Sequence, residues 1–266
     1  MLALISPAKT LDYETPIKLE DHTQPRFLDH SHTLIETLKP YSSKRVAKLM
    51  NLSSKLSDLN VARYRDWHTP FTPDNARQSI LAFKGDVYIG LDASTLTKRD
   101  LNFAQKHLRI LSGLYGVLRP YDLMQPYRLE MGTKIKNPGG KNLYEFWAET
   151  ITDSLNEELN QSKGKVVVNL ASNEYFNAVD TSQLNADIVA PAFLDEKNGE
   201  FKMISFFAKK ARGSMARYLI QERVKSAAGI TGFDRDGYRY DKKLSTTERP
   251  VFTRTEKRQK QIAAAA

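Results

Sequence analysis

Apolar residues recur along this chain in two periods, which predict alternating strands and helices. Short, continuous apolar runs at 2–5 and 165–170 are typical of strands buried on both faces of a sheet. At 143–159, apolar side chains repeat every fourth residue, as on the buried face of an amphipathic helix. The patterns at 31–66 and 72–83 predict further short helices. Together these elements predict an α/β protein.

Two β-prone runs in the second half, 187–194 and 201–208, are joined by a turn that contains Asn-Gly at 198–199. This dipeptide is a strong signal for an antiparallel hairpin, so the sheet is expected to be mixed rather than purely parallel. No internal repeat or linker is visible. We therefore predict a single α/β domain over 1–242, in which helices surround a mostly buried mixed sheet. Residues 243–266 are polar and basic and are expected to form a mobile tail.

Two closely spaced glycines, Gly113 and Gly116, interrupt the helical pattern before them. Thr97 and Asp100 have the spacing of a capping box, which predicts a helix that runs to the first glycine. A second short helix is expected after the glycines, so that 101–125 would form a helix-hairpin-helix element. Backbone N–H groups in such a turn can hold a DNA phosphate without reading the bases. The alternative is an ordinary turn between helices, packed in the core.

The charge of the chain narrows the classes of partner and of chemistry. Forty Lys and Arg against 31 Asp and Glu give a formal net charge of +9, which favours polyanions such as nucleic acid or phosphorylated ligands. The absence of cysteine excludes disulfides, thiolate metal sites, thiol peroxidase chemistry and a cysteine nucleophile. No apolar run has the length of a signal-peptide core or a membrane span, so we expect a cytoplasmic protein without a membrane partner.

Polar side chains follow the two predicted buried strands and could meet in a cleft, because ligands of open α/β sheets bind at the carboxyl ends of strands. An ordinary strand exit with solvated side chains is the alternative. Lys84 and Asp86, in a predicted turn, could join this cleft. The expected lining residues are Ser6, Lys9, Thr10, Asn169, Ser172, Asn173 and Glu174.

Basic residues cluster at the predicted start of a helix after the second hairpin strand. Residues 202–225 contain seven basic residues and one acidic residue, and Lys209, Lys210 and Arg212 are expected in the first helical turn. Cations there oppose the helix dipole, which suggests a bound anion. The alternative is a solvated basic helix end.

Three histidines, His22, His30 and His32, raise the question of a metal site. Imidazoles two residues apart can share an ion only when the segment is extended, and no carboxylate or histidine follows at a ligand spacing. We therefore interpret them as surface residues and predict neither a metal nor another cofactor.

Several blocks of the sequence, in order along most of the chain, resemble the YaaA family of peroxide-stress resistance proteins. The blocks are 5–10 (ISPAKT), 71–77 (FTPDNAR), 81–88 (LAFKGDVY), 111–120 (LSGLYGVLRP), 123–132 (LMQPYRLEMG), 169–176 (NLASNEYF) and 206–213 (FFAKKARG).

The resemblance implies a cytosolic bacterial protein with an unusual single-domain α/β fold and a positively charged cleft. It also implies DNA binding through a helix-hairpin-helix, which fits best at 101–125. Survival of hydrogen peroxide and a low level of unincorporated iron are the roles it suggests. One departure is that Gly113 and Gly116 enclose two residues, where the usual hairpin has one apolar residue between its glycines.

The leading hypothesis is a DNA-binding protein of the peroxide-stress response that contacts mainly phosphates of duplex or structured DNA. Its predicted DNA-binding residues are Lys106, Arg109, Gly113, Gly116, Arg119, Arg128, Lys209, Lys210 and Arg212. A second hypothesis is an enzyme that acts on a small-molecule nucleotide or a flipped base in the cleft. Its candidate catalytic residues are Lys9, Lys84, Asp86 and Glu174, with lysine as phosphate clamp or Schiff-base donor and glutamate as general base. A third is a protein-interaction module with a basic face.

Overall fold

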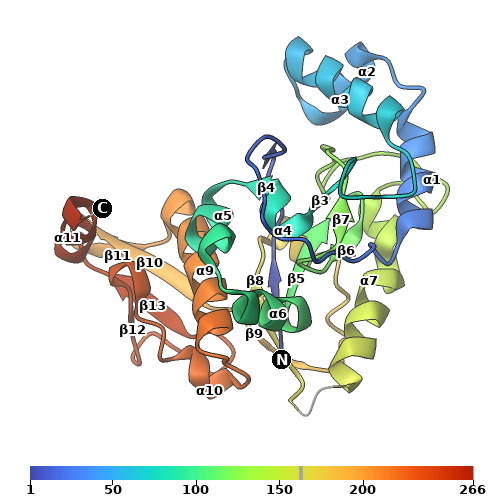
Figure 1. Ribbon diagram of the computed structural model, residues 1–266. Coiled ribbons are helices and arrows are strands. Elements are labelled where there is room, and N and C mark those ends of the chain that lie inside the picture. The colour runs from blue at the N-terminus through green and yellow to red at the C-terminus, as the bar shows by residue number, and fades with distance from the viewer. Residues whose placement is uncertain (162–163, 266) are drawn as a thin grey trace.

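The computed structural model describes residues 1–161 and 164–265, and a mixed five-stranded sheet lies at its centre (Figure 1). Its order is β6-β5-β1-β8-β9. The first strand, β1 (Leu2–Ile5), lies between β5 (Leu108–Ser112) and β8 (Val166–Leu170) and is parallel to both. β9 (Asp187–Val189) continues the parallel set, and β6 (Gly116–Leu118) is antiparallel to β5. The predicted single-domain α/β fold with a mixed sheet is confirmed.

A second sheet of four strands has the order β11-β10-β13-β12. Its strands are β10 (Ala192–Lys197), β11 (Glu200–Lys202), β12 (Arg239–Tyr240) and β13 (Val251–Arg254). The predicted hairpin at 198–199 joins β10 and β11, which are antiparallel. β13 lies buried between β10 and β12, and α11 (Glu256–Ala265) follows it. The expected mobile tail therefore contains an interior strand of this sheet.

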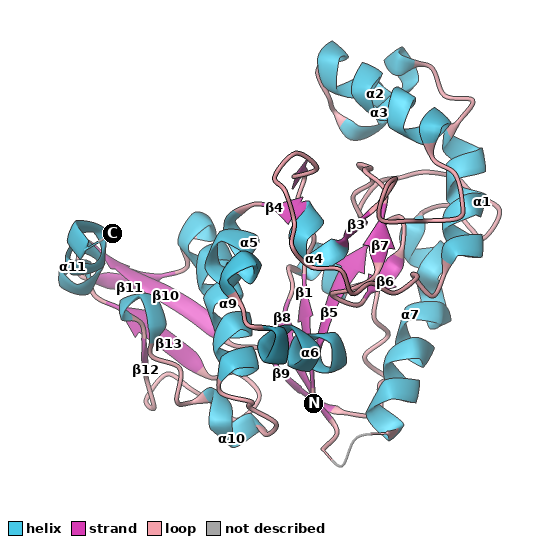
Figure 2. Cartoon of the chain, in the orientation of Figure 1, coloured by secondary structure: helices cyan, strands magenta, loops and turns pink. Residues whose placement is uncertain are grey.

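Helices pack on both sides of the central sheet, as the cartoon in Figure 2 makes visible. α6 (Lys98–His107) and α9 (Ser205–Gln221) contact β1, and α7 (Leu143–Asn160) packs beside β6. The remaining helical segments are α1 (Leu28–Leu38), α2 (Ser43–Met50), α3 (Ser54–Asp66), α4 (Ser79–Ala82), α5 (Asp86–Leu91), α8 (Asn173–Phe176), α10 (Ala227–Ile230) and two 3-10 turns at Ala93–Thr95 and Arg235–Gly237. Two short strand pairs complete the fold, β2 (Thr10–Leu11) with β4 (Phe83–Lys84) and β3 (Arg77–Gln78) with β7 (Leu123–Met124).

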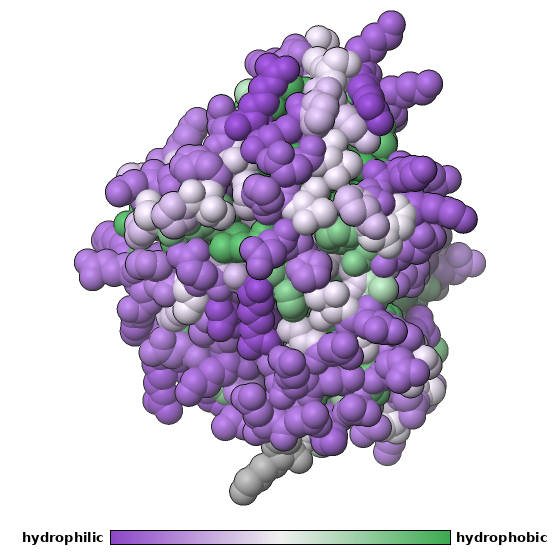
Figure 3. All heavy atoms as spheres, turned by 90° about the vertical axis from the view of Figure 1, so that its right-hand side faces the viewer, coloured by the Kyte–Doolittle hydropathy of each residue, from purple (hydrophilic) through white to green (hydrophobic). Residues whose placement is uncertain are grey.

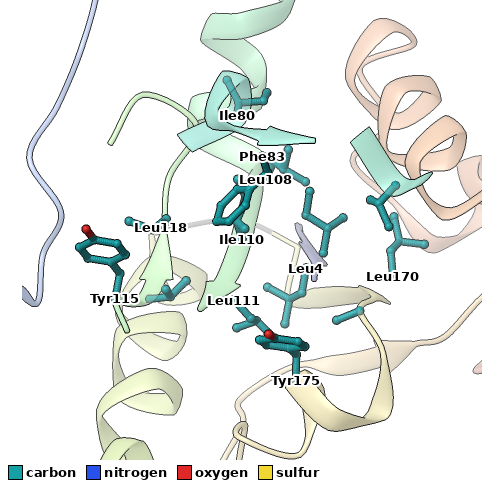
Figure 4. Packing of buried hydrophobic residues seen from close by; sticks show 14 of the residues in the cluster. Leu4, Ile80, Phe83, Leu108, Ile110, Leu111, Tyr115, Leu118, Leu170 and Tyr175 are labelled. Carbon is teal, nitrogen blue, oxygen red and sulfur yellow. The ribbon is translucent and has the colours of Figure 1, made fainter. Parts of the chain in front are cut away.

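The core is built around the three middle strands of the central sheet. Leu4, Ile110 and Leu170, from β1, β5 and β8, are all fully buried and are seen together in Figure 4. Continuous apolar strands suit this position, because helices cover both faces of a parallel sheet. On the side seen in Figure 3, in contrast, the surface is mostly hydrophilic, with small hydrophobic areas between polar side chains.

The predicted helix-hairpin-helix at 101–125 is wrong. The capping box at Thr97 and Asp100 is present, and α6 follows it, but α6 ends at His107. The chain then enters the sheet as β5 and returns as β6, so that Gly113 and Gly116 belong to a β-hairpin. Apolar runs of this length fit a buried strand as well as a helix. Pairing with β1 decides the outcome in favour of the strand.

Two other local predictions also differ from the structure. The helix expected at 72–83 is reduced to α4, because β3 and β4 flank it on either side. Of the strand expected at 201–208, residues 201–202 belong to β11, whereas 205–208 form the first turn of α9. The helices expected at 31–66 and 143–159 are present.

Candidate functional site

The two predicted polar clusters meet at one edge of the central sheet. β1 and β8 are adjacent and parallel, so Ser6 and Ser172, which follow them, lie side by side. The Ser172 amide donates to Ser6 Oγ at 2.9 Å, and the Ser6 hydroxyl donates to Ser172 Oγ at 3.3 Å. Tyr88, on α5, donates its hydroxyl to the Ser6 carbonyl oxygen at 3.2 Å. These bonds fix both strand exits against α5.

A cleft of about 490 Å³ opens above these strand ends. Sites for small ligands commonly have this size. Of the predicted residues, it is lined by Ser6, Lys9, Thr10, Lys84, Asp86, Ser172, Glu174, Lys209 and Arg212. The two asparagines of the prediction, Asn169 and Asn173, instead line a smaller cavity of about 150 Å³, of which Arg212 is also a wall.

Several candidate catalytic groups of the cleft are already engaged. Lys9 Nζ lies 2.8 Å from Glu130 Oε2 in an ion pair, and Lys84 Nζ is 3.9 Å from a carboxylate oxygen of Asp12. The Glu174 carboxylate accepts a hydrogen bond from the Gly132 amide at 3.0 Å. Lys9 and Glu174 therefore each already have a partner within the protein.

The wall formed by α9 is positioned by an unusually close approach to α5. A Cβ on Gly213 would overlap the Val87 carbonyl oxygen, and one on Gly90 would overlap that of Lys210. Only glycines allow the two backbones to touch in this way. The contact holds Lys209 and Arg212 at the edge of the cleft.

The basic cluster on α9 is not in the first helical turn. The helix begins at Ser205, so Lys209, Lys210 and Arg212 lie beyond that turn, and the predicted conflict with the helix dipole is absent. Burial lowers the pKa of the Arg212 guanidinium below its usual value, although arginine still remains charged at neutral pH. Among residues 1–161 and 164–265, nothing forms an ion pair or hydrogen bond with this side chain.

The residues predicted to bind DNA near the glycines are part of the core. Arg109 is only 3% exposed and pairs with Glu158. Gly113 is buried, and its carbonyl oxygen accepts the Trp147 indole N–H at 2.9 Å. Gly116 is buried too, so this hairpin has no surface to offer a phosphate.

The remaining predicted basic residues fall into two groups. Arg119 is paired with Asp122 at 2.8 Å, and Arg128 with Glu130 at 3.2 Å. Lys106, on α6, is exposed. Arg119 and Arg128 are therefore held by neighbouring carboxylates, whereas Lys106 and Lys209 face solvent.

Two helices elsewhere in the chain, α2 and α3, are joined by a short turn. Only Asn51, Leu52 and Ser53 separate α2 from α3, and Asn51 has the left-handed backbone, with φ of 51°. Ser53 caps α3 by accepting the Leu56 amide at 3.4 Å. Figure 1 shows this α2–α3 unit, residues 43–66, projecting from the body beyond α1. The pattern of apolar residues predicts the two helices but not the exposed turn between them, since an Asn and not a glycine occupies that turn.

Two contacts hold the α2–α3 unit together and join it to the core. The hydroxyls of Ser43 and Ser57 are 2.8 Å apart, which links its two helices. At the end of α3, the Tyr64 hydroxyl donates to the Arg128 carbonyl oxygen. The unit is therefore a fixed part of the molecule with its turn directed outward.

The α2–α3 unit is strongly basic. It contains six Lys and Arg residues and two Asp residues. Lys44, Lys48, Lys55 and Arg65 are exposed, and within the described ranges none of them takes part in an ion pair. Free cations spread along two helices, two of them beside the capped start of α3, are suited to binding an extended anion.

A family model described as peroxide stress protein YaaA matches residues 1–244. The chain belongs to this YaaA family. The matched range includes the cleft and the α2–α3 unit, while β13 and α11 lie outside it.

In the described part of this YaaA-family protein, no helix is both long and apolar enough to cross a bilayer. No group of three or more His, Asp or Glu side chains in that part could hold a metal ion.

Proposed function

We propose that this YaaA-family protein acts in the peroxide-stress response by binding DNA through the phosphates, with the α2–α3 unit as the main contact surface. The observation that carries the proposal is the set of unpaired exposed cations on this unit, with Lys48 and Lys55 near the turn at 51–53 and Lys44 and Arg65 at the far ends of the two helices. Backbone N–H groups at the start of α3 add neutral donors beside them. By binding there, the protein helps to limit unincorporated iron and oxidative damage to DNA.

Binding by this surface should be strong at low salt and weak in sequence preference. Each phosphate neutralised releases counterions, so affinity falls steeply as salt rises. Base readout needs side chains that reach into a groove with a donor and acceptor pattern, whereas lysines around a turn act as point charges. Duplexes of different sequence are therefore expected to bind with similar affinity.

The test is a salt titration of duplex binding, measured by fluorescence anisotropy, with the full chain and two double variants. Lys48→Ala/Lys55→Ala should weaken binding to all sequences equally and reduce the slope of log affinity against log salt by about 2. The matched control is Lys257→Ala/Lys260→Ala, two exposed lysines of α11, which lies far from the α2–α3 unit in Figure 1.

Two outcomes would count against the proposal. One is duplex affinity that does not change with salt. The other is an equal loss of affinity in the α11 control, which would mean that total charge, and not the α2–α3 unit, determines binding. In cells that lack the protein, the first variant but not the control should also fail to restore survival of hydrogen peroxide.

A further inference from the structure

The smaller cavity next to the cleft has a lining that selects for an anion. Its polar side chains are two arginines, Arg212 and Arg249, and two asparagines, Asn169 and Asn173, and none of the acidic residues that the structure describes lines it. Asn169 Oδ1 accepts the Ala171 amide at 3.0 Å, so its NH₂ group is left to donate. Each of the four side chains can therefore donate hydrogen bonds into the cavity.

Arg212 is the side chain that the two cavities share. It is partly buried and has no partner among the described residues, which leaves its positive charge uncompensated. A guanidinium that is partly shielded from water and has no counter-charge is stabilised by a bound anion. The planar guanidinium matches two oxygens of a phosphate, and Arg249 on the opposite chain segment supplies a second one.

The larger cavity is chemically different from the smaller one. Its lining mixes carboxylates with cations, and Leu170, Val87 and Tyr175 supply apolar surface. The carboxylates are Asp86, Glu130 and Glu174, the cations are Lys9, Lys84, Lys209 and Arg212, and Glu130 is paired with Lys9. Carboxylates accept hydrogen bonds from hydroxyl and amino groups, and lysines donate to hydroxyl and carbonyl oxygens. This compartment therefore suits the uncharged body of a ligand, such as a sugar with or without a base.

We propose that the two cavities form one site for a small organic phosphate of about nucleotide size, with the phosphate between Arg212 and Arg249 and the body in the 490 Å³ cleft. None of the residues that line either cavity comes from the α2–α3 unit. The site is thus separate from the proposed DNA surface, and either can fail without the other.

The test is isothermal titration calorimetry of the full chain with deoxyadenosine 5′-monophosphate, ribose 5-phosphate and, as the matched probe without phosphate, deoxyadenosine. At least one of the two phosphates should bind saturably and deoxyadenosine should not. Arg249→Met should weaken binding by about tenfold or more, as expected for loss of one charge-assisted bond. Arg249 is exposed, so this variant should keep the fold.

Two further variants and one further probe distinguish a small organic phosphate from the terminal phosphate of a DNA strand as the ligand. Arg212→Met should abolish binding and Arg212→Lys should restore part of it, whereas Lys257→Ala, on α11, should leave the binding of small phosphates unchanged. A DNA strand with a 5′-phosphate presents the same chemical group, so strands with and without it are titrated too. Binding only to the phosphorylated strand, no saturable binding of either small phosphate, or full binding by the Arg212→Met and Arg249→Met variants would overturn the proposal.

Discussion

The sharpest energetic prediction concerns Arg109, a residue whose sequence context suggested DNA contact. In the structure its side chain is 4% exposed, and its guanidinium pairs with Glu158 of α7, whose side chain is 10% exposed. Burial lowers the pKa of Arg109, and the bond to Glu158 opposes that shift. Glu158 also pairs with Arg26 at 3.0 Å, but Arg26 is partly exposed and contributes little.

Replacing Glu158 by leucine would leave the Arg109 charge buried without its counterion. Breaking a buried pair from one side costs about 3–5 kcal/mol. Two bonds from Arg109 Nη1 would remain, to the carbonyl oxygens of Gln105 and Leu108, so the lower end of this range applies. We therefore expect Glu158→Leu to lower the free energy of unfolding by about 3 kcal/mol, a large share of the 5–15 kcal/mol typical of a domain.

The assay is urea unfolding of the single variants Glu158→Leu and Arg109→Met and of the double variant. The double variant removes both charges and should be closer to the wild type than Glu158→Leu is, because no uncompensated charge is left. Folded Arg109→Met protein should bind duplex DNA like the wild type. If Glu158→Leu costs less than about 1 kcal/mol, the pair contributes no more than an exposed ion pair and the prediction is wrong. It is also wrong if Arg109→Met stays folded but loses DNA binding.

Two further predictions follow from the packing and the protonation of the fold. Gly213→Ala should destabilise the protein by several kcal/mol, since its methyl group would overlap the Val87 carbonyl oxygen. The resulting shift of α9 should weaken nucleotide binding while duplex binding persists. Unfolding curves check the first effect, and calorimetry on the same variant checks the second. Desolvation lowers the pKa of His107, so as pH falls the imidazole is protonated in the unfolded chain before it is protonated in the folded one. The free energy of unfolding should therefore fall as pH drops below about 6.5. His107→Phe should flatten that part of the pH profile, and an unchanged profile would show that another group is responsible.

The elements that were predicted correctly are those whose sequence pattern is visible within the element itself. β1 and β8 are continuous apolar runs, and the four-residue repeat of α7 can be read without knowing its partners. β5 contains Arg109 and Ser112 beside three apolar residues, and the partner that makes it a strand is β1, about a hundred residues earlier in the chain. Similarly, Arg109 looked free because Glu158 lies 49 residues away. Charge patterns alone do not distinguish a solvated arginine from a paired one.

Short elements were the other source of error. β13 has only four residues, of which two are apolar, so a polar tail was the natural expectation. Its burial depends on long-range contacts, in which Arg254 pairs with Asp195 at 2.7 Å and Tyr238 donates to the same carboxylate. The turn of the α2–α3 unit was missed for a different reason. Asn51 takes the left-handed conformation for which glycine is the usual sequence signal.

The two proposed sites differ in how far apart their residues lie in the sequence. Asn169, Asn173 and Arg212 of the phosphate site were predicted as cleft or anion-binding residues but Arg249 was not, and no residue of the α2–α3 unit was predicted to bind DNA. The DNA surface uses only residues 43–66, whose basic character and helical pattern are visible locally. The phosphate site combines three distant positions in the sequence: Asn169 on β8, Arg212 on α9 and Arg249 just before β13. Arg249 lies beyond the range matched by the family model, on a segment that pairing of β13 with β10 holds in place. The cleft was therefore predictable as a place where strands end, but its anion selectivity depends on the second sheet bringing Arg249 to it.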